Sequence, residues 1–178
     1  MGGAVATVRS DGSFVIQNVA DGSYRVGVYG MSEDFFLKSG RAGDEDLLDA
    51  GLTISRGQSP GSLELVVSSA AGRVDGVVFG EQKQPFSGAS VVLVPDPPYR
   101  SRTELYKTTT TDQTGGFTLR GIAQGEYKLF AWEEIESGAY QDPDFLRTYE
   151  ARGEALKVGE GGHYSPQLQL IPASEPRP

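Results

Sequence analysis

Few side chains of this chain have the chemistry for catalysis or metal binding. There is one histidine, His163, and no cysteine. A catalytic zinc site takes several histidine or carboxylate ligands at set spacing, and a serine hydrolase needs a histidine supported by its own motif. His163 stands in the turn-like sequence Gly161-Gly162-His163-Tyr164 with no second histidine. We therefore expect a surface turn residue here, no catalytic residue elsewhere, and no enzymatic activity.

Carboxylates gather in two stretches, and carboxylate oxygens are the ligands that calcium prefers. They are Asp44, Glu45, Asp46 and Asp49 in the first stretch, and Glu133, Glu134, Glu136, Asp142 and Asp144 in the second. Neither stretch has the alternating Asp/Asn loop with a closing Glu that calcium loops use. Solvated acidic loops are the favoured interpretation, and we expect no metal and no cofactor.

Aromatic side chains are the best candidates for ligand binding. Trp132, Tyr140, Phe145 and Tyr149 lie in or beside one segment, 133–154. If these rings are exposed and coplanar, they suit stacking on sugar rings. If they point inward, they form a satellite core under a long loop. We favour the core interpretation and keep sugar binding as the alternative.

Composition and charge exclude other partners. The 178 residues carry a net charge of −8 and include Gly 24 and Pro 10. Nucleic acids and anionic membranes need clustered Lys and Arg, so neither is an expected partner. The chain has no apolar run long enough to cross a membrane, so no membrane insertion is expected. Many glycines and prolines suit frequent turns between short strands.

A sequence motif that occurs twice in the chain indicates the elements that position these side chains. Phe117 follows Phe14 by 103 residues (117 − 14), and Tyr127 follows Tyr24 by the same interval. The residues of the pattern are Asp11, Gly12, Phe14, Gly22 and Tyr24 in the first copy, and Asp112, Gly116, Phe117, Gly125 and Tyr127 in the second. A repeat of about 100 residues suits tandem sandwich domains.

The pattern has a structural explanation. Asp112 is suited to accept hydrogen bonds from nearby backbone amides, and Gly115 or Gly116 supplies a positive φ in the turn. Phe117 and Leu119 then point to the same sheet face, and Tyr127 returns to the core with its hydroxyl near a sheet edge. We expect this motif to make the fold and not to bind a ligand.

Short alternating segments predict the strands. In the first copy they are Thr7–Arg9, Ser13–Gln17, Tyr24–Tyr29, Gly51–Ile54 and Ser62–Val67, with an irregular segment and one helical turn over residues 31–50. In the second copy they are Gly72–Phe79, Ala89–Val94, Glu104–Thr111, the two strands of the motif, Ala155–Val158 and Gln167–Ile171. We expect an all-β fold of tandem Greek-key sandwiches, with about seven strands in the complete second copy.

Domain organisation follows from the repeat. Nothing in the first copy matches residues 73–105 of the second. We predict an incomplete domain over residues 1–68 that lacks its opening strands, a complete domain over 69–172, and a flexible tail over 173–178. The chain is then expected to be the C-terminal part of a longer protein.

The second copy also resembles a known family. Gly76-Val77-Val78, Pro85 to Leu93, Thr111 to Phe117 and Gly121 to Leu129 are similar to the carboxypeptidase regulatory-like domain family. The resemblance covers residues 70–172, and its second half recurs in 5–67. It implies a prealbumin-like (transthyretin-like) sandwich of seven strands. Members of the family occur as accessory domains of carboxypeptidases, in adhesins, in starch-binding-like modules and in outer-membrane receptors.

Three hypotheses of function remain open. The favoured one is a non-catalytic structural and interaction module, secreted or in the cell envelope of a bacterium. Its expected partners are other domains of the parent protein or neighbouring subunits. The second is a carbohydrate-binding module that uses the aromatic segment, with a glycan as partner. The third is a self-assembling subunit whose incomplete first copy takes a strand from a neighbour.

Overall fold

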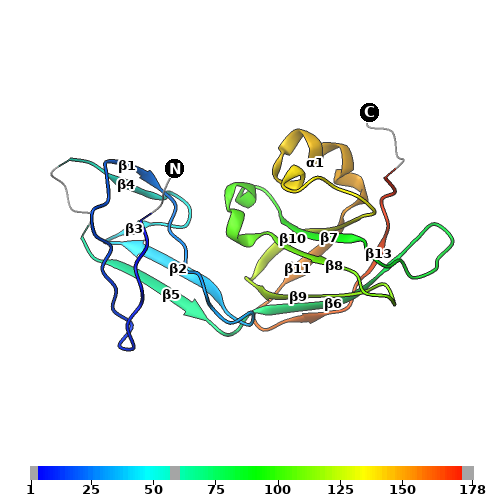
Figure 1. Cartoon of the computed structure of the whole chain (residues 1–178), viewed down its shortest axis with the longest axis horizontal. Coiled ribbons are helices and arrows are strands. Elements are labelled where there is room, and N and C mark those ends of the chain that lie inside the picture. The colour runs from blue at the N-terminus through cyan, green and yellow to red at the C-terminus, as the bar shows by residue number, and fades with distance from the viewer. Residues whose placement is uncertain (1–3, 57–60, 174–178) are drawn as a thin grey trace. The chain divides into compact units, whose positions relative to one another are not determined.

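The computed structural model describes residues 4–56 and 61–173, and these residues form an all-β fold, as predicted from the sequence. They divide into two compact units (Figure 1). One unit falls within Met1–Val26 and Ser39–Leu65, and the other within Gly27–Lys38 and Val66–Pro178. The predicted boundary between residues 68 and 69 stays a prediction. Of the predicted tail, only Ala173 lies among the described residues.

The first sheet of the larger unit is antiparallel and is built around β7 (Ser90–Pro95). Its order is β11-β10-β7-β8, where β8 is Lys107–Thr110, β10 is Gly125–Trp132 and β11 is Glu154–Val158. The β-branched residues of β7 suit a central strand. The predicted strand Glu104–Thr111 begins later than expected, because residues Thr103–Leu105 form the 3-10 turn η2, after the 3-10 turn η1 (Tyr99–Ser101).

The second sheet of this unit is built around β6 (Gly72–Phe79). Strand β9 (Gly116–Ile122) pairs antiparallel with β6 on one edge. On the other edge β12 (His163–Tyr164) and β13 (Gln167–Gln169) pair with β6 in parallel. The last two strands, β12 and β13, therefore complete the second sheet beside β6.

The core of the sandwich lies between these sheets and takes alternate residues from each strand. Val74 and Val78 of β6 contact a cluster that includes Leu93 of β7 and Leu129 of β10. Val92 and Val94 point to the opposite face of β7 and belong to a second buried cluster. Because both faces of β7 are covered, its sequence is almost continuously apolar.

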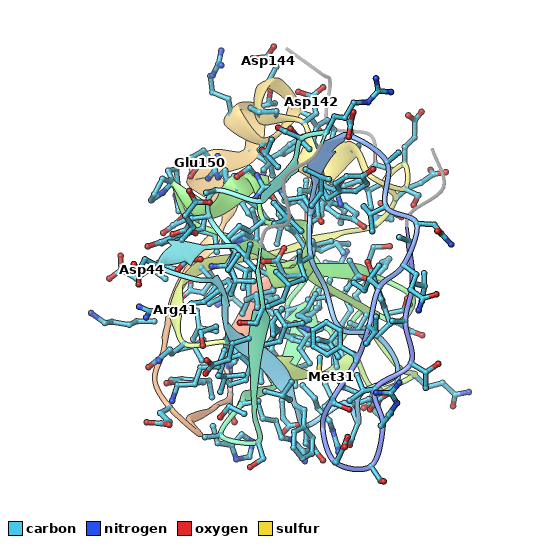
Figure 2. All side chains as sticks on the ribbon, turned by 90° about the vertical axis from the view of Figure 1, so that its left-hand side faces the viewer. Met31, Arg41, Asp44, Asp142, Asp144 and Glu150 are labelled. Carbon is cyan, nitrogen blue, oxygen red and sulfur yellow. The ribbon has the colours of Figure 1, made fainter. Side chains whose placement is uncertain are left out.

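Helical segments cover the outer face of the first sheet (Figure 1). They are the 3-10 turn η3 (Ala139–Gln141), helix α1 (Pro143–Tyr149) and the 3-10 turn η4 (Glu150–Arg152). Helix α1 begins after Asp142, whose side chain accepts a hydrogen bond of 2.8 Å from the Asp144 backbone amide. Pro143 suits the first helical position, and Leu146 is completely buried against the sheet. Figure 2 shows Asp142 and Asp144 at the surface of this helix.

The smaller unit contains shorter sheets. Strand β1 (Gly22–Tyr24) pairs antiparallel with β4 (Leu52–Ile54). A second sheet has the order β3-β2-β5, where β2 is Phe36–Ala42, β3 is Glu45–Asp46 and β5 is Leu63–Ser68. Of this sheet, β3 and the parts of β2 and β5 within Ser39–Leu65 belong to the smaller unit. Ala42, Leu47 and Leu52 form a small buried cluster. Arg41 of β2 and Asp44 of the turn after β2 project outward (Figure 2).

The sequence predictions for the first copy were partly wrong. Thr7–Arg9 and Ser13–Gln17 do not form strands, and Tyr24–Tyr29 contributes only its first residue to β1. In the second copy, the strand equivalent to Ser13–Gln17 is β9, and it pairs with β6. Among the described residues, no strand equivalent to β6 pairs with residues 4–21, so this segment lacks the partner that β9 has. Residues 31–50, expected to be irregular with a helical turn, contain β2 and β3 instead. They form strands because β5 pairs with β2.

Candidate functional site

The repeated motif forms the same kind of turn twice. In the second copy the Asp112 carboxylate accepts hydrogen bonds from the backbone amides of Thr114 (2.8 Å) and Gly116 (2.9 Å). The Thr114 hydroxyl donates a third, of 2.7 Å. These bonds, the one from the Thr114 hydroxyl first, hold the pKa of Asp112 below its ordinary value. Gly115 adopts a φ of 75° in this turn.

The first copy repeats the backbone of this turn but shifts the acid. Arg9 donates its backbone amide to the Ser13 carbonyl at 2.9 Å, as Asp112 does to Gly116 at 2.8 Å. Gly12, with a φ of 83°, matches Gly115. Asp11 accepts from the Ser13 amide at 2.9 Å. At the interval of 103 residues, Arg9 occupies the position of Asp112, so Asp11 stands two positions later in the turn than Asp112.

The tyrosines of the motif make equivalent hydrogen bonds to the backbone. The Tyr127 hydroxyl donates to the Ala123 carbonyl at 2.9 Å, and the Tyr24 hydroxyl to the Ala20 carbonyl at 2.8 Å. The Tyr127 ring lies over Gly125, where an added Cβ would be 3.2 Å from it. Burial raises the pKa of Tyr127 to about 12. Tyr127 therefore stays neutral and holds the chain between β9 and β10.

Three of the four aromatic residues predicted as binding candidates contact one another. Trp132 stacks on Phe130 with 5.0 Å between the ring centroids, and Tyr149 meets it edge-on at 5.8 Å. Phe145 lies 6.1 Å from Trp132 and 5.1 Å from Tyr149. Trp132 is 2% exposed, whereas Phe145 and Tyr149 are half-buried. These rings anchor α1 on the sheet.

The fourth candidate, Tyr140, lies apart from this group. Its ring is half-buried and contacts Tyr106, with 6.1 Å between the centroids. It belongs to the same apolar cluster as Trp132, under the helical segments. A ligand-binding role for the four residues stays a prediction.

A cavity of about 320 Å³ opens beside this aromatic group. Its wall combines aromatic and acidic side chains with the segment that follows β13: Trp132, Glu134, Ile135, Glu136, Ala139, Phe145, Tyr149, Pro172 and Ala173. None of these is a lysine or arginine. The indole Nε1 of Trp132 is buried and has no hydrogen-bond partner within the described part of the chain. The cavity thus joins an apolar wall with negative charge.

A second polar cluster was missed by the sequence analysis. Asp75 on β6 receives two bonds from Arg73, at 2.6 and 2.9 Å, and one of 2.7 Å from the Thr118 hydroxyl on β9. His163 on β12 contacts the same carboxylate through Nε2 at 2.5 Å. Arg73 is the main reason that the pKa of Asp75 lies far below its ordinary value.

This cluster joins the strands of the second sheet. His163 is exposed at the surface, as expected, but it belongs to β12 instead of a turn, and it contacts Asp75. Asp75 lies 88 residues away in the sequence, so no local pattern indicates the pair. Thr118 donates to the carboxylate and not to the histidine, which differs from the order of a catalytic triad. The arrangement is that of a cross-strand link.

Glu150 forms a comparable link at the end of the helical segments. Arg100 donates to both of its carboxylate oxygens at 2.9 Å, and Lys128 of β10 donates at 2.6 Å. Burial acts to raise the pKa of Glu150, but the bonds from Lys128 and Arg100 outweigh it, so the pKa is lowered. The link ties η1 and η4 to the sheet below them.

Metal and membrane sites were also sought in the same residues. Across residues 4–56 and 61–173, no three His, Cys, Asp or Glu side chains are grouped so that they could hold a metal ion. Nor does this part of the chain contain a helix long and apolar enough to span a membrane.

Comparisons with known proteins return likenesses among solved structures. No protein-family model matches the chain, and no curated protein matches it. The major pilin subunit BcpA of Bacillus cereus shares 14% identity over 61% of this chain and 33% of its own, with a TM-score of 0.39. The group B streptococcus pilus 2b backbone protein shares 14% over 68% and 48%, with a TM-score of 0.38. The 5-hydroxyisourate hydrolase of Klebsiella pneumoniae shares 20% over 57% and 90%, with a TM-score of 0.35.

The chain spans less than half the length of either pilin protein.

Proposed function

We propose that the chain is a non-catalytic structural and interaction module that acts outside the cell or in the cell envelope. The resemblance of residues 70–172 to the carboxypeptidase regulatory-like family supports this proposal. The expected partners are other domains of the same protein or neighbouring subunits. The observation that carries the proposal is an unpaired strand edge in the smaller unit.

The internal repeat identifies that edge. Strand β10 pairs with β11 on one side and with β7 on the other. Its equivalent in the first copy, β1, pairs with β4 in the same register: Tyr24 faces Leu52, as Tyr127 faces Leu156. On the side where β7 would lie, β1 has no partner strand within 4–56 and 61–173.

The repeat also indicates what would pair there. In the complete copy Tyr127 faces Pro95 and Leu129 faces Leu93. At the interval of 103 residues, the equivalents of Tyr127 and Leu129 are Tyr24 and Val26. An unpaired edge with apolar neighbours accepts an added strand, because main-chain bonds supply affinity and alternate side chains fill pockets. We infer that the smaller unit binds an antiparallel, apolar strand of the β7 kind, supplied by another segment or subunit.

Hydrogen–deuterium exchange tests this function. The probe is a capped synthetic peptide with the sequence of residues 89–95, added to the whole chain. Slower exchange of the amides over residues 23–26 is the expected result. The control is the same peptide with proline in place of its one leucine, at the position of Leu93, because proline cannot donate to the ladder. Unchanged exchange together with a monomer at high concentration in sedimentation would overturn the proposal.

Glycan binding is the second candidate, because Phe145 and Tyr149 line the cavity beside α1. Sugar stacking needs an exposed ring face, and Trp132 is only 2% exposed and already stacked on Phe130. A glycan would therefore have to use Phe145 and Tyr149. Retention of the chain on a polysaccharide affinity gel, lost in a variant with Phe145→Ala and Tyr149→Ala, would support this candidate.

A further inference from the structure

We propose that the cavity beside α1 binds a lysine or arginine side chain of a protein partner. Glu134 and Glu136 would hold the cationic group, and Phe145 and Tyr149 would contact the aliphatic stem. This inference rests on the proposed interaction function and names one partner chemistry for it. It concerns the larger unit, whereas strand addition concerns the smaller one.

Charge is the first argument. Glu134 and Glu136 line the cavity and form no ion pair with any described residue. Other acids of the same region are engaged: Glu150 pairs with Arg100 and Lys128, and Asp144 with Arg147 at 2.8 Å. Within residues 4–56 and 61–173, the two acids at the cavity thus have no cationic partner. Charge complementarity favours a positively charged occupant.

Size and wall chemistry are the second argument. A cavity of about 320 Å³ lies at the lower end of the range for small-molecule sites. It suits one long side chain better than an oligosaccharide. Long basic side chains lay their methylene groups along apolar surface and keep the charged end in a polar setting. Phe145 and Tyr149 supply that surface, and aromatic rings also attract cations.

Trp132 also lies in the wall of the cavity. Its ring is 2% exposed and stacks on Phe130, so it forms part of the fixed apolar wall. An occupant of the cavity would therefore change the surroundings of this indole.

Hydrogen bonds hold the wall of the cavity in place. The Glu133 amide donates to the Ile171 carbonyl at 2.9 Å, and the Ala173 amide donates to the Glu133 carboxylate at 3.0 Å. These bonds fix the segment after β10 beside the segment after β13. Asp142 caps α1, which carries Phe145 and Tyr149. A wall that is ordered before binding lowers the entropy cost of binding.

Fluorescence provides a direct test, because Trp132 is the single tryptophan of the chain. The probe is a capped tripeptide, Gly-Lys-Gly, titrated into the whole chain, and its matched control carries an acetylated lysine. We expect a saturable change in Trp132 emission in the millimolar range. The acetylated peptide should bind about tenfold more weakly or not at all, because it keeps the stem and loses the charge.

Variants locate the binding site. A double variant with Glu134→Gln and Glu136→Gln should weaken peptide binding about tenfold, because charge-assisted bonds are lost. The matched control, Glu64→Gln with Glu81→Gln, makes the same change in net charge at exposed positions away from the cavity. It should leave binding unchanged. Circular dichroism of both double variants confirms that they fold.

Several outcomes would overturn the inference. They are equal binding of the acetylated and unmodified peptides, equal effects of the two double variants, and no change in emission across the titration. A saturable change caused by a neutral oligosaccharide, with no change caused by the peptide, would assign the cavity to a glycan. The peptide used for strand addition contains no lysine, so either proposal can fail while the other stands.

Discussion

The hydroxyl group of Tyr127 donates a hydrogen bond to the carbonyl oxygen of Ala123, four residues earlier in the chain. Tyr24 makes the same bond to Ala20. Each bond closes the turn that leads into the strand paired with β11 or β4. The repeated motif is thus repeated down to a single side-chain hydrogen bond, and its role in both copies is structural.

Replacing Tyr127 with phenylalanine should lower the free energy of unfolding of the larger unit by about 1 kcal/mol. The ring stays in the core, but the Ala123 carbonyl loses its donor. Tyr24→Phe should have a smaller effect, because Tyr24 is half-buried and water can replace its hydroxyl. Urea unfolding followed by Trp132 emission measures the first variant. Equal stability of Tyr127→Phe and the native chain would contradict the structural role.

Replacing Gly115 with alanine should destabilise the larger unit more than replacing Gly161. Both glycines have positive φ, 75° and 61°, so both variants carry the left-handed strain of about 1–2 kcal/mol. Only at Gly115 would the new Cβ meet backbone, 2.9 Å from the Phe86 nitrogen, whereas nothing lies within 4 Å at Gly161. Thermal unfolding of the two variants isolates the steric contribution. Equal melting temperatures would show that the turn has room for a methyl group.

Replacing Leu146 with alanine should cost about 2–5 kcal/mol, because its side chain is completely buried between α1 and the sheet. The exposed neighbour Arg147→Ala serves as control and should change stability by less than about 0.5 kcal/mol. Denaturant unfolding compares the two variants. Similar stability of both would mean that α1 contributes little to the larger unit.

The Asp75 cluster predicts a dependence of stability on pH. Because the folded pKa of Asp75 is lowered, its stabilising contribution is present above its ordinary pKa of 3.8 and is lost as the pH falls toward the folded value. Asp75→Asn should therefore destabilise the chain by about 1 kcal/mol at pH 7. The difference from the native chain should shrink below pH 3.8.

Chemical denaturation across this pH range is the measurement. Asp44→Asn is the matched control, because Asp44 is exposed and projects outward (Figure 2). A stability difference for Asp75→Asn that is the same at pH 3 and pH 7 would contradict the assignment.

Local sequence patterns were sufficient to predict many of the strands in the larger unit. The span Gly72–Phe79 was predicted with the bounds of β6, and the run of β-branched residues after Ala89 was predicted as a central strand. These signals lie within a few residues of one another, and the strands they describe are buried on one or both faces. In the first copy Phe36–Ala42 has no such pattern, and it forms β2 where it pairs with β5.

The candidate sites were harder to predict than the strands, because they depend on contacts between residues that are distant in the sequence. The aromatic residues of the 132–149 segment were found from composition, but the acidic wall of the cavity was interpreted only as a solvated loop. The contact between Asp75 and His163 joins residues of two different strands, and neither residue has a local signature. The unused donor of Trp132 could be recognised only once its neighbours were known.

The sequence by itself determined the all-β class, the internal repeat and the turn chemistry of Asp112 and Tyr127. These follow from side-chain periodicity and from backbone conformations that few residue types adopt. Only the tertiary structure decided which strand edges are paired, which acids find a cation, and where a cavity forms. Those properties depend on residues that are distant in the chain and meet when the sheets and α1 pack.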